Sequence, residues 1–202
     1  MAQDTSAYKP LKHTGTVRLE TARLILRQTT VADAEQMYAN YAADPEVTKY
    51  LMWKPHASVE VSKGILADWD KQNAKMDYYH WGIVLKETGQ LIGAGGSQGI
   101  NEINQSTELG YCLGRMYWGK GLMSEAVAAM IAYLFGVVGL HRIFARYDPH
   151  NIASGRVMEK CGMIYEGTHR HEGYSELLGF YDLAYYAILK DEWEALVPKA
   201  IW

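Results

Sequence analysis

Apolar side chains recur at two different spacings along the chain, and the changes between them predict the order of its elements. Runs rich in β-branched and aromatic residues predict strands at 19–27, 78–86, 91–99, 107–114, 142–147, 163–166 and 177–189. Helical spacing of apolar residues from Leu122 to Leu134 predicts a helix with one buried face. Capping residues predict further helices that begin at Thr30, Asp44, Ser58 and Asn151. This order predicts a mixed α/β sandwich.

No repeat, low-complexity tract or linker divides the 202 residues. We therefore expect a single domain over residues 16–202, preceded by a flexible tail over residues 1–15. The tail has no apolar stretch typical of a signal peptide. The longest uncharged stretch, Ala126 to Leu140, is shorter than the roughly 20 residues that span a membrane. The net charge of −3 gives no support for nucleic acid or an anionic membrane as a partner. We expect a cytoplasmic protein.

Metal and disulfide chemistry have little support in the sequence. The two cysteines, Cys112 and Cys161, fit neither a disulfide framework nor a zinc motif. The segment from His169 to Glu172 holds a His-x-His pair and a carboxylate, but the chain offers no clear third and fourth ligand. A solvated loop is the better interpretation, and we expect no metal.

The most informative local motif is Gly119-Lys120-Gly121, directly before the predicted helix at Leu122. A helix begins with unpaired N–H groups and about half a positive charge, which together favour an anion. Glycine removes the Cβ atoms that would keep a phosphate away from the backbone, and Lys120 adds a cation. Taken alone, however, such a turn fits a tight strand-to-helix connection better than a ligand site.

Further motifs change that balance, because together they resemble the GNAT superfamily of N-acetyltransferases. They are Arg23-Leu-Ile-Leu-Arg27, Asp44-Pro-Glu-Val-Thr-Lys-Tyr-Leu51, Glu108-Leu-Gly-Tyr111, Asn151-Ile-Ala-Ser154-Gly-Arg-Val-Met-Glu-Lys-Cys-Gly162 and Tyr181-Asp-Leu-Ala-Tyr-Tyr186 with Glu192-Trp193. They are similar to the RimJ/RimL-like branch, which acetylates protein N-termini, from about residue 18 to 194. The chain departs from the family at Met116, where members carry Arg or Gln, and Arg115 lies one residue early.

The resemblance implies a fold, a reaction and a co-substrate. The fold is the α+β GNAT fold, a mixed and mostly antiparallel sheet of about six to seven strands, with a splayed central strand pair and flanking helices. The reaction is direct transfer of acetyl from acetyl-CoA to a primary amine, most simply a protein or peptide N-terminal α-amine. Two alternatives stay open: a small-molecule amine (an aminoacyl conjugate, a polyamine or an antibiotic) as acceptor, and a non-catalytic acetyl-CoA sensor. A homodimer is a further possibility that the family offers.

The same resemblance implies where coenzyme A binds. Its site would comprise Tyr111, Cys112, Leu113, Met116, Tyr117, Trp118, Gly119, Lys120, Gly121, Leu122, Met123, Asn151 and Ser154. The pantetheine arm would lie in the wedge between strands 108–113 and 142–147. There a free N–H of Tyr111, Cys112 or Leu113 could bond the thioester oxygen. Asn151 would cap its helix and could also bond the pantetheine amides. A covalent role for Cys112 is disfavoured, since no His or acidic partner can be assigned to it.

Proton transfer offers three candidates, each compatible with a plainer role. The place where many members have an acid Tyr holds Met158, which cannot donate a proton, so Ser154 is the candidate acid for the CoA thiolate. A hydroxyl that only bonds backbone fits Ser154 about as well. Glu108 and Glu172 are candidates for the base, or else solvated carboxylates. Trp53 is expected to form a wall of the acceptor site, with Glu108 and Glu172 also near the acceptor.

Overall fold

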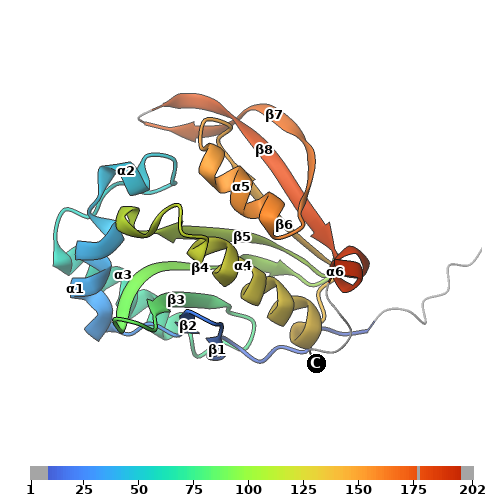
Figure 1. The fold of residues 1–202 in the computed structure, drawn as a ribbon, viewed down its shortest axis with the longest axis horizontal. Helices are drawn as coiled ribbons and strands as arrows, with labels where there is room; N and C mark the ends of the chain where they lie inside the picture. Colours follow the sequence, from blue (N-terminus) through green and yellow to red (C-terminus); the bar gives the residue numbers. More distant parts are fainter. Residues whose placement is uncertain (1–8, 177, 197–202) are drawn as a thin grey trace, which may run out of the picture.

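An eight-stranded sheet forms the centre of the computed structural model, which describes residues 9–176 and 178–196. The strand order is β1-β2-β3-β4-β5-β6-β8-β7, and each neighbouring pair is antiparallel except β5 and β6, which run parallel (Figure 1). The strands are β1 Leu19–Glu20, β2 Leu24–Arg27, β3 His80–Leu85, β4 Gln90–Asn101, β5 Ser106–Leu113, β6 Arg142–Tyr147, β7 Ile164–Ser175 and β8 Gly179–Leu189. The mixed, mostly antiparallel sheet predicted from the sequence is confirmed.

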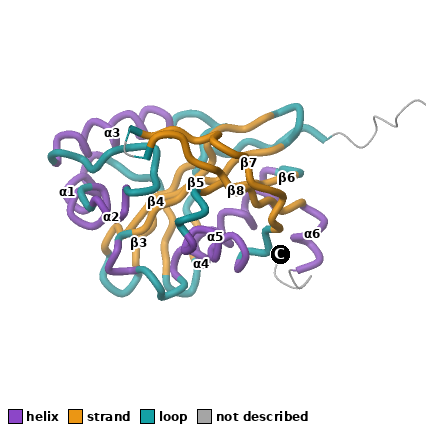
Figure 2. Tube along the Cα trace, turned by 90° about the horizontal axis from the view of Figure 1, so that it is seen from above, coloured by secondary structure: helices purple, strands orange, loops and turns teal. Residues whose placement is uncertain are grey.

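Helices cover both faces of this sheet. The segments α3 and α4 lie on opposite sides of the strands, and α5 lies beside α4 (Figure 2). The α-helices are α1 Ala34–Met37, α2 Pro45–Thr48, α3 Val59–Gln72, α4 Leu122–Tyr133, α5 Ile152–Lys160 and α6 Lys190–Leu196. A 3₁₀ turn precedes α1, and π-helical turns extend α1 to Ala42 and α4 to Val138. Among the described residues, none of these helices has the length and apolar character needed to cross a membrane.

The larger core lies between α4 and the sheet. The apolar positions that predicted the helix are all buried there, namely Leu122, Ala126, Val127, Met130, Ile131 and Leu134. A second core packs α1 and α3 against the opposite face and includes Met37, Tyr41 and Leu66. Burial of two such faces, at roughly 25 cal/mol per Å² of apolar area, is the main stabilising contribution to the fold.

Three sequence-based expectations need correction. The strand expected over 19–27 is two short strands, because the chain turns back between Glu20 and Leu24 and pairs with itself, so the sheet has eight strands. Residues 169–172, expected as a loop, belong to β7, which is far longer than predicted and pairs with β8. Ser58 precedes α3 and Asn151 precedes α5, as expected, but neither side chain makes a capping bond.

The chain before residue 16 is partly fixed to the domain. The N–H of Lys12 donates to the Val138 carbonyl, and the N–H of Gly15 donates to the Met76 carbonyl. The Thr14 hydroxyl bonds the Tyr133 hydroxyl. These contacts join residues 12–15 to the domain, although the sequence placed them in the tail; residues 1–8 lie outside the described part of the chain.

Candidate active site

The sheet opens between β5 and β6. These strands pair only where Ser106–Glu108 meets Arg142–Phe144, although β5 continues to Leu113 and β6 to Tyr147. Beyond Glu108, β5 pairs with β4 alone, so backbone groups on its other edge have no ladder partner. The splayed pair expected from the sequence is therefore present, at the expected strands.

One side chain spans this opening on the side of α4 and α5. The Tyr111 hydroxyl lies 3.1 Å from the Ser154 Oγ, in the first turn of α5, and also donates to the Ser154 carbonyl at 3.1 Å. Burial raises the pKa of Tyr111, and the bond to Ser154 only partly opposes this. Two residues assigned to the coenzyme site from sequence thus meet across the split.

The Gly-x-Gly turn has the backbone form that glycine permits. Gly119 and Gly121 both have φ of +73°, in the left-handed region, and an added Cβ at Gly119 would meet open space. Among the described residues, the N–H groups from Gly119 to Met123 have no hydrogen-bond acceptor. Lys120 places its Nζ 5.7 Å from the centroid of the Tyr117 ring. Several exposed N–H donors beside a lysine fit an anionic ligand.

The residues just before this turn contribute differently from what the sequence suggested. Arg115 pairs with Asp44 at 3.0 Å, and Met116 is 82% exposed. The Trp118 ring donates through Nε1 to the Leu113 carbonyl at 2.6 Å, which fastens the turn to the end of β5. Arg23, from the turn between β1 and β2, donates to the Lys120 carbonyl at 2.9 Å.

On the other face of the split sheet, a polar network joins four strands. Its members, called the carboxylate network below, are Glu108 of β5, Arg146 of β6, Tyr185 of β8, and Glu172 and His169 of β7. Arg146 donates to Glu108 at 2.9 Å and to Glu172 at 3.2 Å. Tyr185 donates to Glu172, and His169 Nδ1 lies 2.6 Å from its other oxygen. Both carboxylates proposed from the sequence are thus brought together.

The electrostatics of the network favour the ionised form of Glu172, whose pKa is lowered. The hydrogen bond from Tyr185 is the largest cause that lowers the pKa of Glu172, and His169 adds to it. Partial burial works to lower the pKa of Arg146, but hydrogen bonds from Arg146 to Glu108 and Tyr185 outweigh it, so that this pKa is raised. One guanidinium therefore holds two carboxylates, and the network carries a net negative charge when His169 is neutral.

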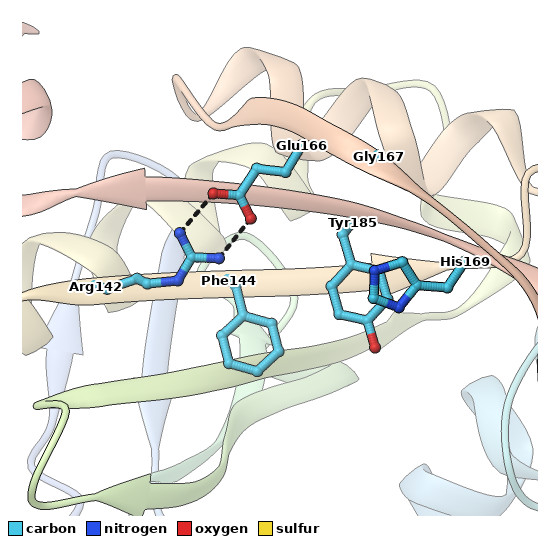
Figure 3. A pocket seen from close by; sticks show the side chains of 6 residues that line it. All are labelled: Arg142, Phe144, Glu166, Gly167, His169 and Tyr185. Atoms are coloured by element: carbon cyan, nitrogen blue, oxygen red, sulfur yellow. Dashed lines mark hydrogen bonds and ion pairs between the residues drawn. The ribbon is translucent and has the colours of Figure 1, made fainter.

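A shallow pocket of about 300 Å³ adjoins the network. It is lined by Arg142, Phe144, Glu166, Gly167, His169 and Tyr185. Figure 3 shows the Arg142–Glu166 ion pair at one end, His169 and Tyr185 at the other, and the Phe144 ring between them. Because Tyr185 and His169 belong to both, the pocket and the carboxylate network form one continuous surface.

Cys112 has the environment of a structural thiol. It lies on β5, and burial raises the pKa of its thiol to about 12. The only polar contact found for it among the described residues is with the backbone N–H of Ala94. A thiol that stays protonated and has no basic partner is a poor nucleophile.

Trp53 lies on the α2–α3 loop and packs against the second core, as Cys112 does. Its ring centroid is 5.3 Å from that of His56. The neighbouring Lys54 pairs with Glu176, at the tip of the β7–β8 hairpin. The loop and the hairpin tip therefore meet on the face that carries the network. No group of three or more His, Cys, Asp or Glu side chains suited to a metal ion is found within the part of the chain that the structure describes.

Reasoning from sequence missed Arg23, Arg146 and Tyr185. Arg146 contacts partners 26 to 39 residues away in the chain, so no local spacing could have indicated them. Arg23 stands in a motif that supported the resemblance, but its contact with Lys120 joins segments 97 residues apart. Only the strand order brings these groups together.

Comparisons with known proteins identify the family of this chain. The model of the acetyltransferase (GNAT) domain matches residues 23–164. An uncharacterized N-acetyltransferase, p20 of Bacillus licheniformis, is 34% identical over 87% of this chain and 97% of its own. The [ribosomal protein uS5]-alanine N-acetyltransferase of Escherichia coli is 31% identical over 75% of this chain and 80% of its own.

Solved structures share the fold. A GNAT-family acetyltransferase from Bacillus anthracis superposes with a TM-score of 0.75 at 28% identity, over 87% of this chain and 99% of its own. A GCN5-related N-acetyltransferase from Brucella melitensis superposes with a TM-score of 0.81 at 21% identity, over 94% of this chain and 86% of its own. The chain belongs to the GNAT family of N-acetyltransferases, in the RimJ/RimL-like branch that its motifs indicate.

Proposed function

We propose that this N-acetyltransferase transfers acetyl from acetyl-CoA to the N-terminal α-amine of a protein or peptide. The observation that carries the proposal is the carboxylate network at the point where β5 and β6 separate. It puts negative charge beside the opening, on the face away from α4 and α5. A relative that acetylates the alanine of a ribosomal protein supports the same acceptor class.

Acetyl-CoA would bind along β5 and the glycine turn. The unpaired N–H groups from Gly119 to Met123, with Lys120, suit its diphosphate. The unpaired edge of β5 from Tyr111 to Leu113 suits the pantetheine amides and the thioester oxygen. Asn151 is proposed to contact the pantetheine arm, as expected from the sequence, since its side chain makes no capping bond at the start of α5.

Two proton transfers accompany the reaction. The amine nitrogen forms a bond to the thioester carbon, the carbon–sulfur bond breaks, and the CoA thiolate takes up a proton. Ser154 is the proposed donor, since its hydroxyl lies at the split and contacts Tyr111. Tyr111 can in turn donate to Ser154 and orient it, because its raised pKa keeps the phenol protonated.

The attacking ammonium must also lose a proton, and the carboxylate network is the proposed acceptor. Glu108 lies at the last paired position of β5, so it is the carboxylate nearest the opening along that strand. Arg146 fixes Glu108 and Glu172 relative to each other. An α-amine, with a pKa of about 8, is partly neutral at neutral pH, so a carboxylate reached directly or through water suffices.

A peptide acceptor is supported by the surface around this network. Tyr174 and Phe180 form an exposed aromatic pair on the β7–β8 hairpin, with centroids 5.1 Å apart, and Met52 on the facing loop is also exposed. Such an apolar rim offers more contact area than a small amine would use. Trp53, beside Met52, is proposed as part of the same acceptor wall.

Thiol release from acetyl-CoA against a panel of amines tests the proposal. Each peptide should be paired with the same peptide carrying a blocked N-terminus, and the panel should include lysine, polyamines and aminoglycosides. We expect release with free N-termini only, with the acetyl group located on the α-nitrogen by mass spectrometry. Release with small amines alone would overturn the acceptor class. Silence throughout, with CoA binding intact, would favour a non-catalytic role.

A further inference from the structure

Arg23 connects the Lys120 carbonyl in the glycine turn to the Glu125 carboxylate in α4. Its Nη1 donates to the Lys120 carbonyl at 2.9 Å, and its Nε donates to Glu125 Oε2 at 2.7 Å. The backbone N–H of Arg23 and the Thr21 hydroxyl both donate to the other oxygen of Glu125. Since Glu125 lies in the first turn of α4, the β1–β2 turn is fastened to the start of that helix.

The contact with Lys120 has a direct consequence for the next N–H group. A trans peptide is planar, so its N–H points opposite to its C=O. By holding the Lys120 carbonyl on its own side, Arg23 directs the N–H of Gly121 to the other side. Gly121 has a left-handed backbone that could otherwise move to several conformations at little cost. Arg23 therefore selects one orientation of a flexible peptide.

Other groups near the turn do not make this contact. Met116, where the family carries Arg or Gln, has no donor and is exposed. Arg115 is paired with Asp44, and the Lys120 ammonium lies by the Tyr117 ring. Arg23 is about half exposed, and its Nη2 lies 3.7 Å from where a Cβ of Gly121 would stand.

We propose that Arg23 is a positioning residue for acetyl-CoA, which holds the Lys120–Gly121 peptide so that the Gly121 N–H faces the diphosphate. The inference rests on the proposed coenzyme turn and not on the identity of the acceptor. Arg23, in the β1–β2 turn and far from residue 116 in the sequence, would thus order the glycine turn. Met116 cannot do this, because its side chain has no hydrogen-bond donor.

The test compares the Arg23→Ala and Arg23→Lys variants with Arg18→Ala. Arg18 is the matched control, because it is also an exposed, ion-paired arginine beside β1, bonded to Glu20 at 2.8 Å. Calorimetry with CoA should show a dissociation constant raised about ten- to hundredfold in Arg23→Ala, as for the loss of one charged hydrogen bond. Arg23→Lys should lie between this variant and the parent, and Arg18→Ala should match the parent.

A truncated substrate separates positioning from general damage to the fold. S-acetylpantetheine carries the thioester but no diphosphate, so Arg23→Ala should use it as well as the parent does. With acetyl-CoA the same variant should show a raised KM and an unchanged kcat. Equal losses with both thioesters, or unchanged CoA affinity, would overturn the role of Arg23. A parent that fails to bind CoA would instead refute the proposed coenzyme turn.

Discussion

The Tyr111 hydroxyl, on β5, lies 3.1 Å from the Ser154 hydroxyl, on α5, across the opening between the two halves of the sheet. The pair joins a strand and a helix that sequence reasoning assigned to one site, and its two residues are 43 positions apart in the sequence. It leads to the first prediction. Replacing Ser154 by Ala should lower kcat about 10- to 100-fold, the low end of what a positioned acid contributes, with the CoA dissociation constant unchanged. Tyr111→Phe, which keeps the Ser154 hydroxyl, should lower kcat less. Rapid-quench kinetics and calorimetry provide the check, and an unchanged kcat in Ser154→Ala would remove Ser154 from the mechanism.

The carboxylate network gives a second prediction, on acceptor use. Glu172→Gln removes a charge that Arg146, Tyr185 and His169 all contact, so kcat/KM for a peptide acceptor should fall at least about tenfold. KM for acetyl-CoA should not change. Glu87→Gln, in the exposed β3–β4 turn, is the control and should behave like the parent. Steady-state kinetics with varied peptide measures both effects; equal losses in the two variants would contradict a role at the acceptor site.

The third prediction concerns Cys112. Because burial raises the pKa of its thiol to about 12 and no His or carboxylate contact is found for it among the described residues, Cys112→Ser should keep kcat within about threefold of the parent. Cys161, the other buried thiol, provides the matched substitution. Intact-protein mass spectrometry after mixing with acetyl-CoA should show no acetylated enzyme. Detection of an acetyl group on Cys112 during turnover would require a covalent mechanism.

A fourth prediction separates strain from function at the glycines. Gly121 and Gly89 have left-handed φ angles of +73° and +68°, and each should lose about 1 kcal/mol or more of stability when changed to Ala. Only Gly121→Ala should also raise KM for acetyl-CoA, since Gly89 lies in the β3–β4 turn. Urea unfolding and kinetics on both variants test this. If Gly89→Ala raised the same KM, the effect would be one of stability.

The fifth prediction is a pH dependence of folding from His80. Burial lowers its pKa to about 4, and its Nδ1 has no hydrogen-bond partner among the residues that the structure describes. His80 therefore takes up a proton at a higher pH in the unfolded chain than in the folded chain. The resulting stability is fully present above about pH 6.5 and falls by about 3 kcal/mol as the pH decreases to 4. His80→Phe, which keeps a ring against Trp69, should abolish that slope in urea unfolding measured from pH 7 to 4. An unchanged slope would show that another group causes it.

Elements whose apolar residues recur at a regular spacing were predictable from the sequence, and elements without such a spacing were not. The face of α4 could be derived because its apolar residues recur every three to four positions and all pack on one sheet. The strand β7 could not, since it is an edge strand, most of its side chains are exposed, and two register shifts interrupt its pairing with β8. His171, at the second of these shifts, has a positive φ of 52°, which breaks any alternation.

The residues of the candidate site also differ in how far the sequence could predict them. The glycine turn and Ser154 belong to local motifs, so their sequence spacing indicates their place. Arg146 and Tyr185 have an ordinary sequence context and gain their role only because β6 and β8 are neighbours in the sheet. Glu172 was a candidate by resemblance, but its partners depend on the bulged course of β7.

The short pairing of β5 with β6 also affects the cohesion of the molecule. Three residue pairs connect the backbone of the first five strands to that of the last three, so the two halves of the sheet are joined over a short stretch beside the proposed active site. A pantetheine arm bonded along the free edge of β5 and packed beside β6 would act as a temporary extra strand. Binding of acetyl-CoA would then strengthen the connection between the two halves of the sheet, and release of coenzyme A would weaken it again.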